Sequence, residues 1–379
     1  MKVTVSVHGR YHGFELAKGL YARHCLDQLL TTYPAFLARR WVGAGAPVKS
    51  AMALEIRRRL HARFGFGPRP DLQIARRFGE FARDHVSATS DIFVGWSSAS
   101  LEAITPARAA GAKVIIERGS THIAAQTEVL REAYRHFALP FAETDGEMIE
   151  REQQEYEQAD RISVPSTHAA RTFIDRGFAS EKILVNGLGV DLGRFHAPPH
   201  RPTDRPPRIL FVGGIGLRKG VPWLLEAFAP LAARAELHVV GPVSPDFQAL
   251  LRCHPLASVH MRGAIVGSAL AAEYGRADIF CLPSIEEGYG MVIAEAMACG
   301  LPIVTTHAVG AVDLLTPGLD GLVVPPADSP ALALALEQLV DDAELRQKMG
   351  RRALETVRAG HSWEDYMERT LASYEKVLG

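Results

Sequence analysis

The chain has 379 residues, 47% of them hydrophobic and 22% charged, a composition typical of globular proteins and a length sufficient for two domains. The formal net charge of −1 provides no overall attraction to nucleic acid, which we do not expect as a partner. The four cysteines are scattered without a C-x-x-C pair, which argues against a disulfide framework or a structural zinc site. Because no apolar leader segment and no run of about 18 apolar residues occurs, we expect a cytoplasmic protein without membrane-spanning helices.

Strands and helices alternate in the first half of the chain. Short apolar runs typical of strands are separated by segments whose apolar residues have helical spacing. The predicted strands are 2–7, 91–96, 113–117 and 161–166, and the predicted helices are 15–30, 100–110, 128–159 and one beginning at 167. This alternation predicts a parallel sheet with helices on both faces.

A basic stretch lies within residues 39–77. It contains ten basic residues against only Glu55 and Asp71, and aromatic residues are interleaved with them. Two interpretations stay open: contact with an anionic membrane surface, or a solvated helical face followed by a loop, which is the more common role of a charge run. The basic residues are Arg39, Arg40, Lys49, Arg57, Arg58, Arg59, Arg63, Arg69, Arg76 and Arg77, and the aromatic ones Phe36, Trp41, Phe64, Phe66 and Phe78.

A proline-rich break at residues 195–208 divides the chain. Its five prolines and polar neighbours do not fit inside a helix or a strand, which predicts a linker. Beyond it the alternation of strands and helices restarts, beginning with the apolar run at 209–212. We therefore predict an α/β protein with two domains of similar size joined by a hinge.

Glycines follow the first predicted strand of the second domain, in the segment FVGGIGLRKG at 211–220. A strand that passes through glycines into a helix is the layout of nucleotide-binding turns. A Walker P-loop starting at Gly213 requires a glycine where Arg218 stands, and a dinucleotide fingerprint starting at Gly214 requires one where Lys219 stands. The glycines leave room for a diphosphate and the two basic residues offer cationic donors, but a structural turn with a surface basic pair fits equally well.

One carboxylate, Glu295, stands inside the apolar segment PSIEEGYGMVIAEAMACGLPIV at 283–304. A lone buried charge is costly unless something pairs with it. Gly288 and Gly290 predict a tight loop before a helix that begins at about Met291, and such a helix start binds anions. At the carboxyl end of a strand in an open α/β sheet, this arrangement predicts a phosphate site with Glu295 accepting hydrogen bonds from sugar hydroxyls. Pairing of Glu295 with a structural arginine is the alternative.

This segment closely resembles the signature of the family 4, or group 1, glycosyltransferases. That signature has two glutamates separated by seven residues, with Gly-aromatic-Gly after the first and Ala-Met-Ala after the second. Glu287, Glu295, 288–290 and 296–298 fit it. The resemblance extends over nearly all of residues 160–379, and more loosely over the first strand, GRYHGFELAKGL and VIIERGSTHI.

The resemblance implies the GT-B fold, in which two Rossmann-like domains face each other across a cleft. The implied domains are an acceptor-side domain at 1–194, a linker at 195–207 and a donor-binding domain at 208–360. A helix at 361–379 is expected to cross back to the first domain.

The resemblance further implies a retaining enzyme that moves a sugar from a nucleotide-diphosphate sugar to a hydroxyl. The expected acceptor is a polysaccharide or other glycan, a lipid-linked sugar or a small alcohol, and a functional basic stretch would hold the enzyme at the inner face of the membrane. No Asp-x-Asp motif occurs, so we expect no metal and no other cofactor. The alternatives are a nucleotide-sugar epimerase or phosphorylase on the same fold, or a binding protein without turnover.

Site residues of the second domain follow from the same resemblance. Glu295 would bind the ribose hydroxyls and Glu287 the transferred sugar. Lys219, with Arg218, would neutralise the leaving diphosphate. The other implied donor contacts are Gly213 and Gly214 beside the diphosphate, the backbone of Gly288, Tyr289, Gly290 and Met291, and the segment from Arg262 to Ile265 around the nucleobase.

Two segments of the first domain complete the implied site. The loop from Gly9 to Gly13 would approach the diphosphate and the acceptor. Many relatives place a histidine near the reacting centre after the strand at 113–117, and His122 is our candidate for that role, with Arg118 as the second.

Overall fold

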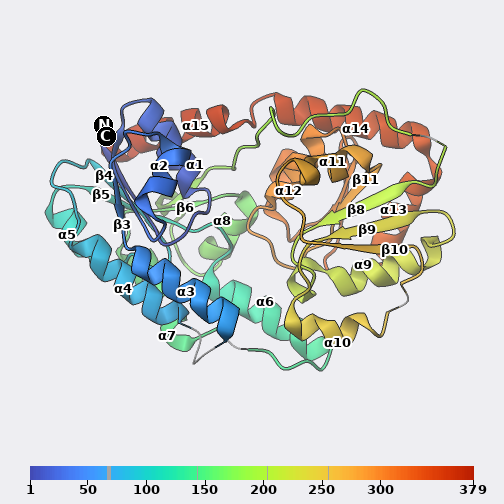
Figure 1. The fold of residues 1–379 in the computed structure, drawn as a ribbon, viewed down its shortest axis with the longest axis horizontal. Helices are drawn as coiled ribbons and strands as arrows, with labels where there is room; N and C mark the ends of the chain where they lie inside the picture. Colours follow the sequence, from blue (N-terminus) through green and yellow to red (C-terminus); the bar gives the residue numbers. More distant parts are fainter. Residues whose placement is uncertain (66–69, 143, 203, 255) are drawn as a thin grey trace.

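The structure, a computed structural model, describes residues 1–65, 70–142, 144–202, 204–254 and 256–379 (Figure 1). Within these residues the chain forms two parallel β-sheets, one of seven strands and one of six, with helices packed around each. The strands of the first sheet end at Val185 and those of the second begin at Arg208. The expected α/β architecture is confirmed, whereas the domain boundaries at 194 and 207 stay predictions.

The first sheet has the strand order β3-β2-β1-β4-β5-β6-β7. Its central strands β1 and β4 are buried along their whole length, as expected when helices cover both faces of a parallel sheet. The strands are β1 (Val3–Val7), β2 (Leu26–Thr31), β3 (Val48–Ser50), β4 (Ile92–Trp96), β5 (Lys113–Glu117), β6 (Arg161–Val164) and β7 (Ile183–Val185). The helices are α1 (Gly13–Ala22), α2 (Ala35–Val42), α3 (Met52–Phe64), α4 (Asp71–Arg83), α5 (Leu101–Ala109), α6 (Ile123–His136), α7 (Gly146–Gln158) and α8 (Thr167–Ile174).

The second sheet has the order β10-β9-β8-β11-β12-β13. Its strands are β8 (Arg208–Val212), β9 (Glu236–Val240), β10 (Val259–Gly263), β11 (Ile279–Leu282), β12 (Ile303–Thr306) and β13 (Gly321–Val324). The helices are α9 (Val221–Phe228), α10 (Gln248–Leu251), α11 (Ser268–Arg276), α12 (Met291–Ala298), α13 (Ser329–Asp341), α14 (Ala343–Arg358) and α15 (Trp363–Leu378).

Two sequence-based expectations for the first domain are wrong. The helix expected over 15–30 ends at Ala22, because His24 adopts a left-handed φ of +59° and the leucines that follow belong to strand β2. The helix expected over 128–159 is two helices, α6 and α7. Pro140 stands between them, and proline disfavours the helical conformation in the residue before it and has no N–H to donate.

Helix α15 packs on the first domain, so the two chain ends lie close together (Figure 1). Met367 of α15 lies so close to Gly19 of α1 that an added Cβ would be 2.4 Å from its Sδ, which only glycine avoids. Asn186, which follows the first sheet, donates from Nδ2 to Oγ1 of Thr370 at 2.6 Å. The end of the chain therefore ties the second domain back to the first.

No helix in the described part of the chain is long and apolar enough to cross a membrane. Of the basic stretch, for which membrane contact and a solvated face were both left open, Phe66 and Arg69 lie outside the described residues.

Candidate active site

The candidate site lies where the carboxyl ends of β8 and β11, which are neighbours in the second sheet, meet the start of α12. Gly290 caps this helix with a φ of +91°, a left-handed conformation that side chains with a Cβ rarely adopt. The free N–H groups of the first turn of α12 carry partial positive charge. This end of the helix is therefore suited to an anion, as the sequence predicted.

Two cations from the turn after β8 face two carboxylates from the loop before α12. Lys219 forms an ion pair with Glu287, while Nη1 of Arg218 lies 3.1 Å from Oε2 of Glu286 and Nη2 lies 3.9 Å from Oε2 of Glu287. Burial lowers the pKa of the Lys219 ammonium below its ordinary value, although the Glu287 carboxylate opposes this shift. The structure thus brings together Arg218, Lys219 and Glu287, three of the residues predicted from the sequence.

Glu286 joins the two domains, a role that the sequence did not reveal. Its Oε1 accepts hydrogen bonds from Ser120 Oγ at 3.0 Å and Thr121 Oγ1 at 2.7 Å, and its Oε2 from Gln126 Nε2 at 2.8 Å. Burial raises the pKa of Glu286, but the Arg218 charge and these hydrogen bonds outweigh that effect and lower the pKa to about 2. Glu286 is therefore ionised and held from both sides of the cleft.

The backbone around Gly288 makes close contact with the first domain. A Cβ added to Gly288 would lie 2.3 Å from the Cα of Ser120. The carbonyl of Gly288 accepts a hydrogen bond from Ser166 Oγ at 2.7 Å. The neighbouring Tyr289 is buried and donates from its hydroxyl to the carbonyl of Leu188 at 2.8 Å. The predicted glycine loop thus forms part of the domain interface, and glycine is needed at 288 because the backbone of Ser120 in the first domain comes so near.

Glu295 lies one turn inside α12 and accepts a hydrogen bond from Tyr274 Oη at 2.8 Å. Burial raises the pKa of Glu295, although this hydrogen bond and the charge of Arg194 oppose the shift. Glu295 and Met291 line a pocket of about 520 Å³ together with His12 and its neighbours in the loop after β1. The pocket therefore has walls from both domains, and a carboxylate faces it. Among the described residues no arginine forms an ion pair with Glu295, so the structural pair considered above is not found there.

A histidine in the same pocket was not singled out by the sequence analysis. Nε2 of His12 lies 2.9 Å from Oε1 of Glu117, both side chains are buried, and the imidazole lies beside Trp96. His12 is in the loop after β1 and Glu117 ends β5, so the carboxyl ends of two strands in one sheet bring them together. The one available signal was the position of His12 next to Gly13, in the loop predicted to approach the ligand.

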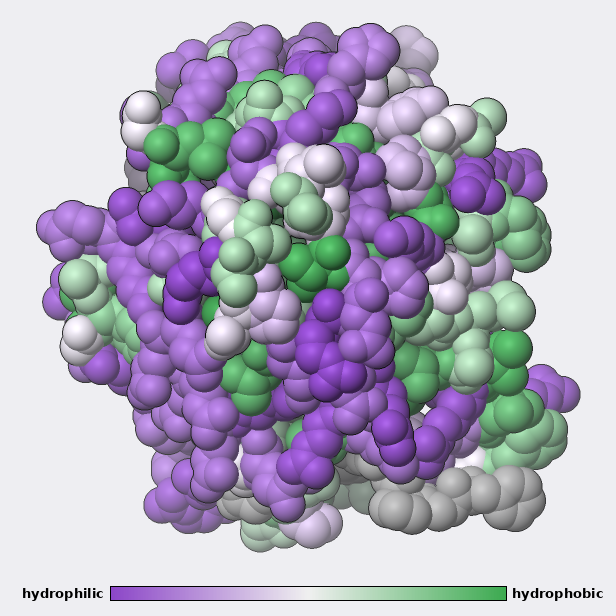
Figure 2. All heavy atoms as spheres, turned by 90° about the vertical axis from the view of Figure 1, so that its left-hand side faces the viewer, coloured by the Kyte–Doolittle hydropathy of each residue, from purple (hydrophilic) through white to green (hydrophobic). Residues whose placement is uncertain are grey.

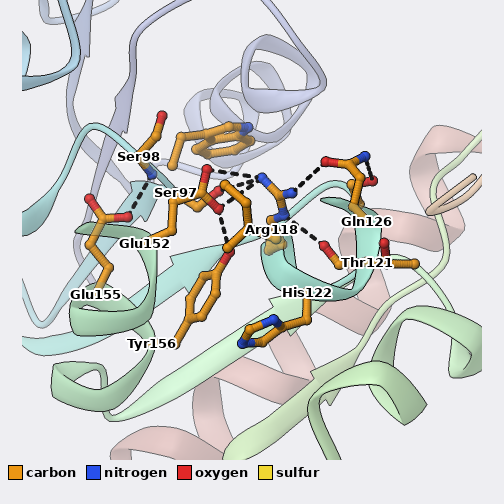
Figure 3. A network of polar contacts seen from close by, with 12 residues as sticks. Ser97, Ser98, Arg118, Thr121, His122, Gln126, Glu152, Glu155 and Tyr156 are labelled. Carbon is orange, nitrogen blue, oxygen red and sulfur yellow. Dashed lines mark hydrogen bonds and ion pairs between the residues drawn. The ribbon is translucent and has the colours of Figure 1, made fainter. Parts of the chain in front are cut away.

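Arg118 and His122, the two candidates from the first domain, serve other contacts (Figure 3). Arg118 is held by Glu152 at 2.9 Å, Gln126 at 3.1 Å and the carbonyl of Thr121 at 2.9 Å, so its contact with Glu286 is indirect, through Gln126 and Thr121. The His122 ring lies beside Tyr156, and its Nδ1 accepts a hydrogen bond from the backbone N–H of Ala124 at the start of α6.

The environment of His122 keeps its imidazole neutral. Burial, with smaller contributions from the charges of Arg176 and Arg118, lowers the pKa of His122 to about 4. The structure does not bring this ring together with Lys219 and Glu287, since its side chain caps a helix and lines a different pocket.

The remaining predicted residues lie at the ends of β8 and β10. Gly213, with a φ of +156°, follows β8 and lies beside the side chain of Lys219, while the space around Gly214 is open. Arg262 is paired with Glu273 at 3.3 Å, and Ile265 is half-buried beyond the end of β10. These segments border the same edge of the second sheet as α12.

The sequence is similar to those of known glycosyltransferases. Residues 206–342 match the family model described as glycosyl transferases group 1. The chain is 34% identical over 262 residues to the D-inositol 3-phosphate glycosyltransferase of Kineococcus radiotolerans, a match that covers 60% of this chain and 59% of that protein. The chain spans about half the length of the curated relatives it matches.

Solved structures resemble the chain over its whole length. Sucrose-phosphate synthase from Thermosynechococcus elongatus superposes with a TM-score of 0.73, covering 100% of this chain and 99% of the other at 20% identity. The structure of Anabaena HepE in complex with UDP superposes with a TM-score of 0.69, covering 99% of this chain and 100% of the other at 15% identity. At such low identities these likenesses concern the fold alone.

Proposed function

We propose, because residues 206–342 match the group 1 glycosyltransferases and the chain has the GT-B fold, that it moves a sugar from a nucleotide-diphosphate sugar to a hydroxyl acceptor with retention of the anomeric configuration. The observation that carries the proposal is the pair of cations, Arg218 and Lys219, held beside the N-terminus of α12. A diphosphate needs both features, and no redox cofactor has to be invoked.

In the proposed reaction, negative charge develops beside the positively charged side chains of the site. As the bond between C1 of the sugar and the phosphate oxygen breaks, negative charge develops on the diphosphate, and Lys219 and Arg218 stabilise it. A single fixed donor of this kind lowers a barrier by about 3 kcal/mol. The acceptor oxygen bonds to C1 on the same face, and its proton passes to the departing phosphate oxygen. This route uses only side chains and substrates, without a metal ion.

Donor binding would change the partners of the two cations. Lys219 is paired with Glu287, and a diphosphate carries more negative charge than the carboxylate it would replace. Glu287, once released, would be free to accept hydrogen bonds from the sugar. Glu295, whose raised pKa reflects burial beside a pocket, would accept hydrogen bonds from the ribose.

A thermal-shift panel tests the donor site. UDP-, GDP-, ADP- and TDP-sugars are added in the presence of a chelator, with NAD as control. The UDP-sugars are tested first, because HepE, which shares the fold, was solved in complex with UDP. A ligand at about 100 times its Kd should add about 2.7 kcal/mol of stability. A shift with one nucleotide-sugar that the Glu295→Gln variant loses supports the proposal, whereas a shift with NAD alone contradicts it.

Transfer is separated from the alternatives by product analysis. Release of free nucleotide only when a hydroxyl acceptor is present indicates transfer. Conversion of the donor sugar without any acceptor indicates an epimerase, and sugar phosphate formed with inorganic phosphate indicates a phosphorylase. Binding without turnover in all three assays indicates a binding protein.

We further propose that the first domain contacts an anionic membrane surface through α3, within the basic stretch at 39–77. Four apolar side chains are exposed at intervals of four residues along this helix, so they form one line, while Arg57, Arg59 and Arg63 are exposed on the same helix. The four are Met52 (45% exposed), Ile56 (48%), Leu60 (53%) and Phe64 (54%).

The surroundings of α3 fit a bilayer better than water. Phe36 of α2, in the same domain, is also exposed, at 70%. Figure 2 views the molecule from this end and shows a mostly hydrophilic surface with hydrophobic side chains gathered towards its lower right edge. An apolar line flanked by arginines is the pattern of a helix that lies in a lipid interface.

Co-sedimentation with vesicles tests this contact. We expect binding to vesicles that contain phosphatidylglycerol, weakened by salt, and little binding to phosphatidylcholine alone. The double variant Ile56→Gln, Leu60→Gln should lose it, whereas Leu334→Gln, which changes a leucine 67% exposed on the second domain, should not. Equal binding by both variants, or none by the wild type, contradicts the proposal.

A further inference from the structure

A group of polar side chains lies across three neighbouring strands of the second sheet. Glu236 and His238 are two residues apart on β9, so their side chains point to the same face, and His260 of β10 is the direct cross-strand partner of His238. Nε2 of His238 lies 3.0 Å from Oε2 of Glu236, and the two imidazole rings are 4.7 Å apart. Each of the three residues has a potential metal-ligand atom, an imidazole nitrogen or a carboxylate oxygen, and these three atoms lie within 4.8 Å of one another.

The fold itself does not require this group. Leu237 and Val239 supply the buried face of β9, and the site predicted above lies at the opposite, carboxyl end of the strands. Two imidazoles side by side repel each other when protonated. Here the His238 ring lies between the Glu236 carboxylate, 3.0 Å from its Nε2, and the ring of His260, so the three side chains face one another without a hydrophobic partner between them.

We propose that Glu236, His238 and His260 bind a divalent transition-metal ion, with Zn²⁺ as the best fit. Two imidazole nitrogens and one carboxylate oxygen are a frequent zinc ligand set, in which water completes a tetrahedron. With bonds of about 2.1 Å, tetrahedral ligands lie about 3.4 Å apart. Rotation of the exposed His260 side chain closes most of the remaining distance, since His238 and Glu236 already lie 3.0 Å apart.

Arg208 of β8 completes the environment. Its Nε donates to Oε2 of Glu236 at 2.9 Å, the same oxygen that lies 3.0 Å from His238 Nε2, and this contact fixes the orientation of the carboxylate. Its positive charge also reduces the attraction for any cation. Hard ions such as Mg²⁺, which depend on several anionic oxygens, are therefore disfavoured more than Zn²⁺, Ni²⁺ or Cu²⁺, which bind imidazole well.

A metal at this position would tie an edge strand to the sheet. β10 has a single neighbour, β9, and its pairing shifts register between Met261 and Gly263. The residues directly after this irregularity, up to Ile265, are those predicted to hold the nucleobase. Resting on the proposed function, we infer that the metal steadies the strand that presents the donor base.

Titration of the full-length, chelator-treated protein with Zn²⁺ or Co²⁺ alone tests the site, by calorimetry and by the visible absorption of tetrahedral Co²⁺. We expect one ion per chain. His260→Ala should weaken binding at least about tenfold, because it removes a ligand from an exposed position and leaves the fold unchanged. His200→Ala, which removes another exposed histidine, should have no effect.

The assay contains no nucleotide sugar, so its result is independent of the donor site. Binding that persists unchanged in His260→Ala and in Glu236→Gln places the ion elsewhere and overturns the proposal, as does the absence of any binding to the wild type. Binding of Mg²⁺ as tight as that of Zn²⁺ contradicts the assigned ligand chemistry.

Discussion

Replacement of Glu286 by glutamine should destabilise the protein by about 3 kcal/mol at pH 7. The carboxylate is 2% exposed and takes part in four contacts, three from the first domain and one from Arg218. The pKa of Glu286 is lowered from 4.5 to about 2, against the effect of burial, by the Arg218 charge and by these hydrogen bonds. That difference corresponds to about 3 kcal/mol in favour of the ionised form, which glutamine lacks.

The pH dependence has a definite sign. Because the folded protein binds the proton of Glu286 less readily than the unfolded chain, this stabilisation is present above pH 4.5 and disappears as the pH falls towards 2. The difference between wild type and variant should therefore shrink in acid. Urea unfolding followed at pH 7 and at pH 3 measures both values.

Glu128→Gln provides the matched control. Like Glu286, Glu128 of α6 is paired with an arginine, Arg176, but its side chain is 61% exposed. Exposed ion pairs contribute about 1 kcal/mol or less. If Glu286→Gln loses no more stability than this control, the carboxylate does not hold the domains together and our interpretation of the interface is wrong.

Three further predictions concern single residues. Lys219→Ala should lower the transfer rate of the folded variant about 100-fold, and turnover near the wild-type rate would remove Lys219 from the site. Gly288→Ala should enlarge the radius of gyration in solution scattering, because the new Cβ would lie 2.3 Å from the Cα of Ser120; an unchanged radius contradicts the tight contact. With a pKa of about 4 in the folded protein against 6.5, His122 should remove about 2 kcal/mol of stability between pH 7 and 5. Asparagine also caps helices but does not titrate, so the His122→Asn variant should not lose these ~2 kcal/mol between pH 7 and 5. If wild type and variant lose the same stability over this pH range, the prediction is wrong.

The sequence predicted well those parts of the site that are contiguous in the chain. The turn with Arg218 and Lys219 and the loop before α12 each lie directly after a strand, and the carboxyl ends of parallel strands meet at one edge of the sheet. The position of Glu295 inside an apolar helix likewise indicated a buried carboxylate, and burial indeed raises its pKa.

Contacts between the two domains could not be predicted. Glu286 is 165 residues away from Thr121 in the chain, and nothing local distinguishes it from its neighbour Glu287. His12 and Glu117 are 105 residues apart and meet only because β1 and β5 end on the same side of the first sheet. His122 looked like a candidate because it follows a strand, but the start of α6 uses its ring as a cap.

The two adjacent glutamates differ in what holds them, and this difference separates donor binding from the contact between the domains. Glu286 is bound by three groups of the first domain as well as by Arg218, whereas Glu287 is ion-paired with the two cations of its own domain, Lys219 and Arg218. A diphosphate would compete with Glu287 for Lys219, since phosphate oxygens are strong acceptors for ammonium groups. It would not compete with Ser120, Thr121 or Gln126 for Glu286, because those donors lie on the other side of the interface. We infer that donor binding exchanges the partner of Glu287 and leaves the contact between the domains in place.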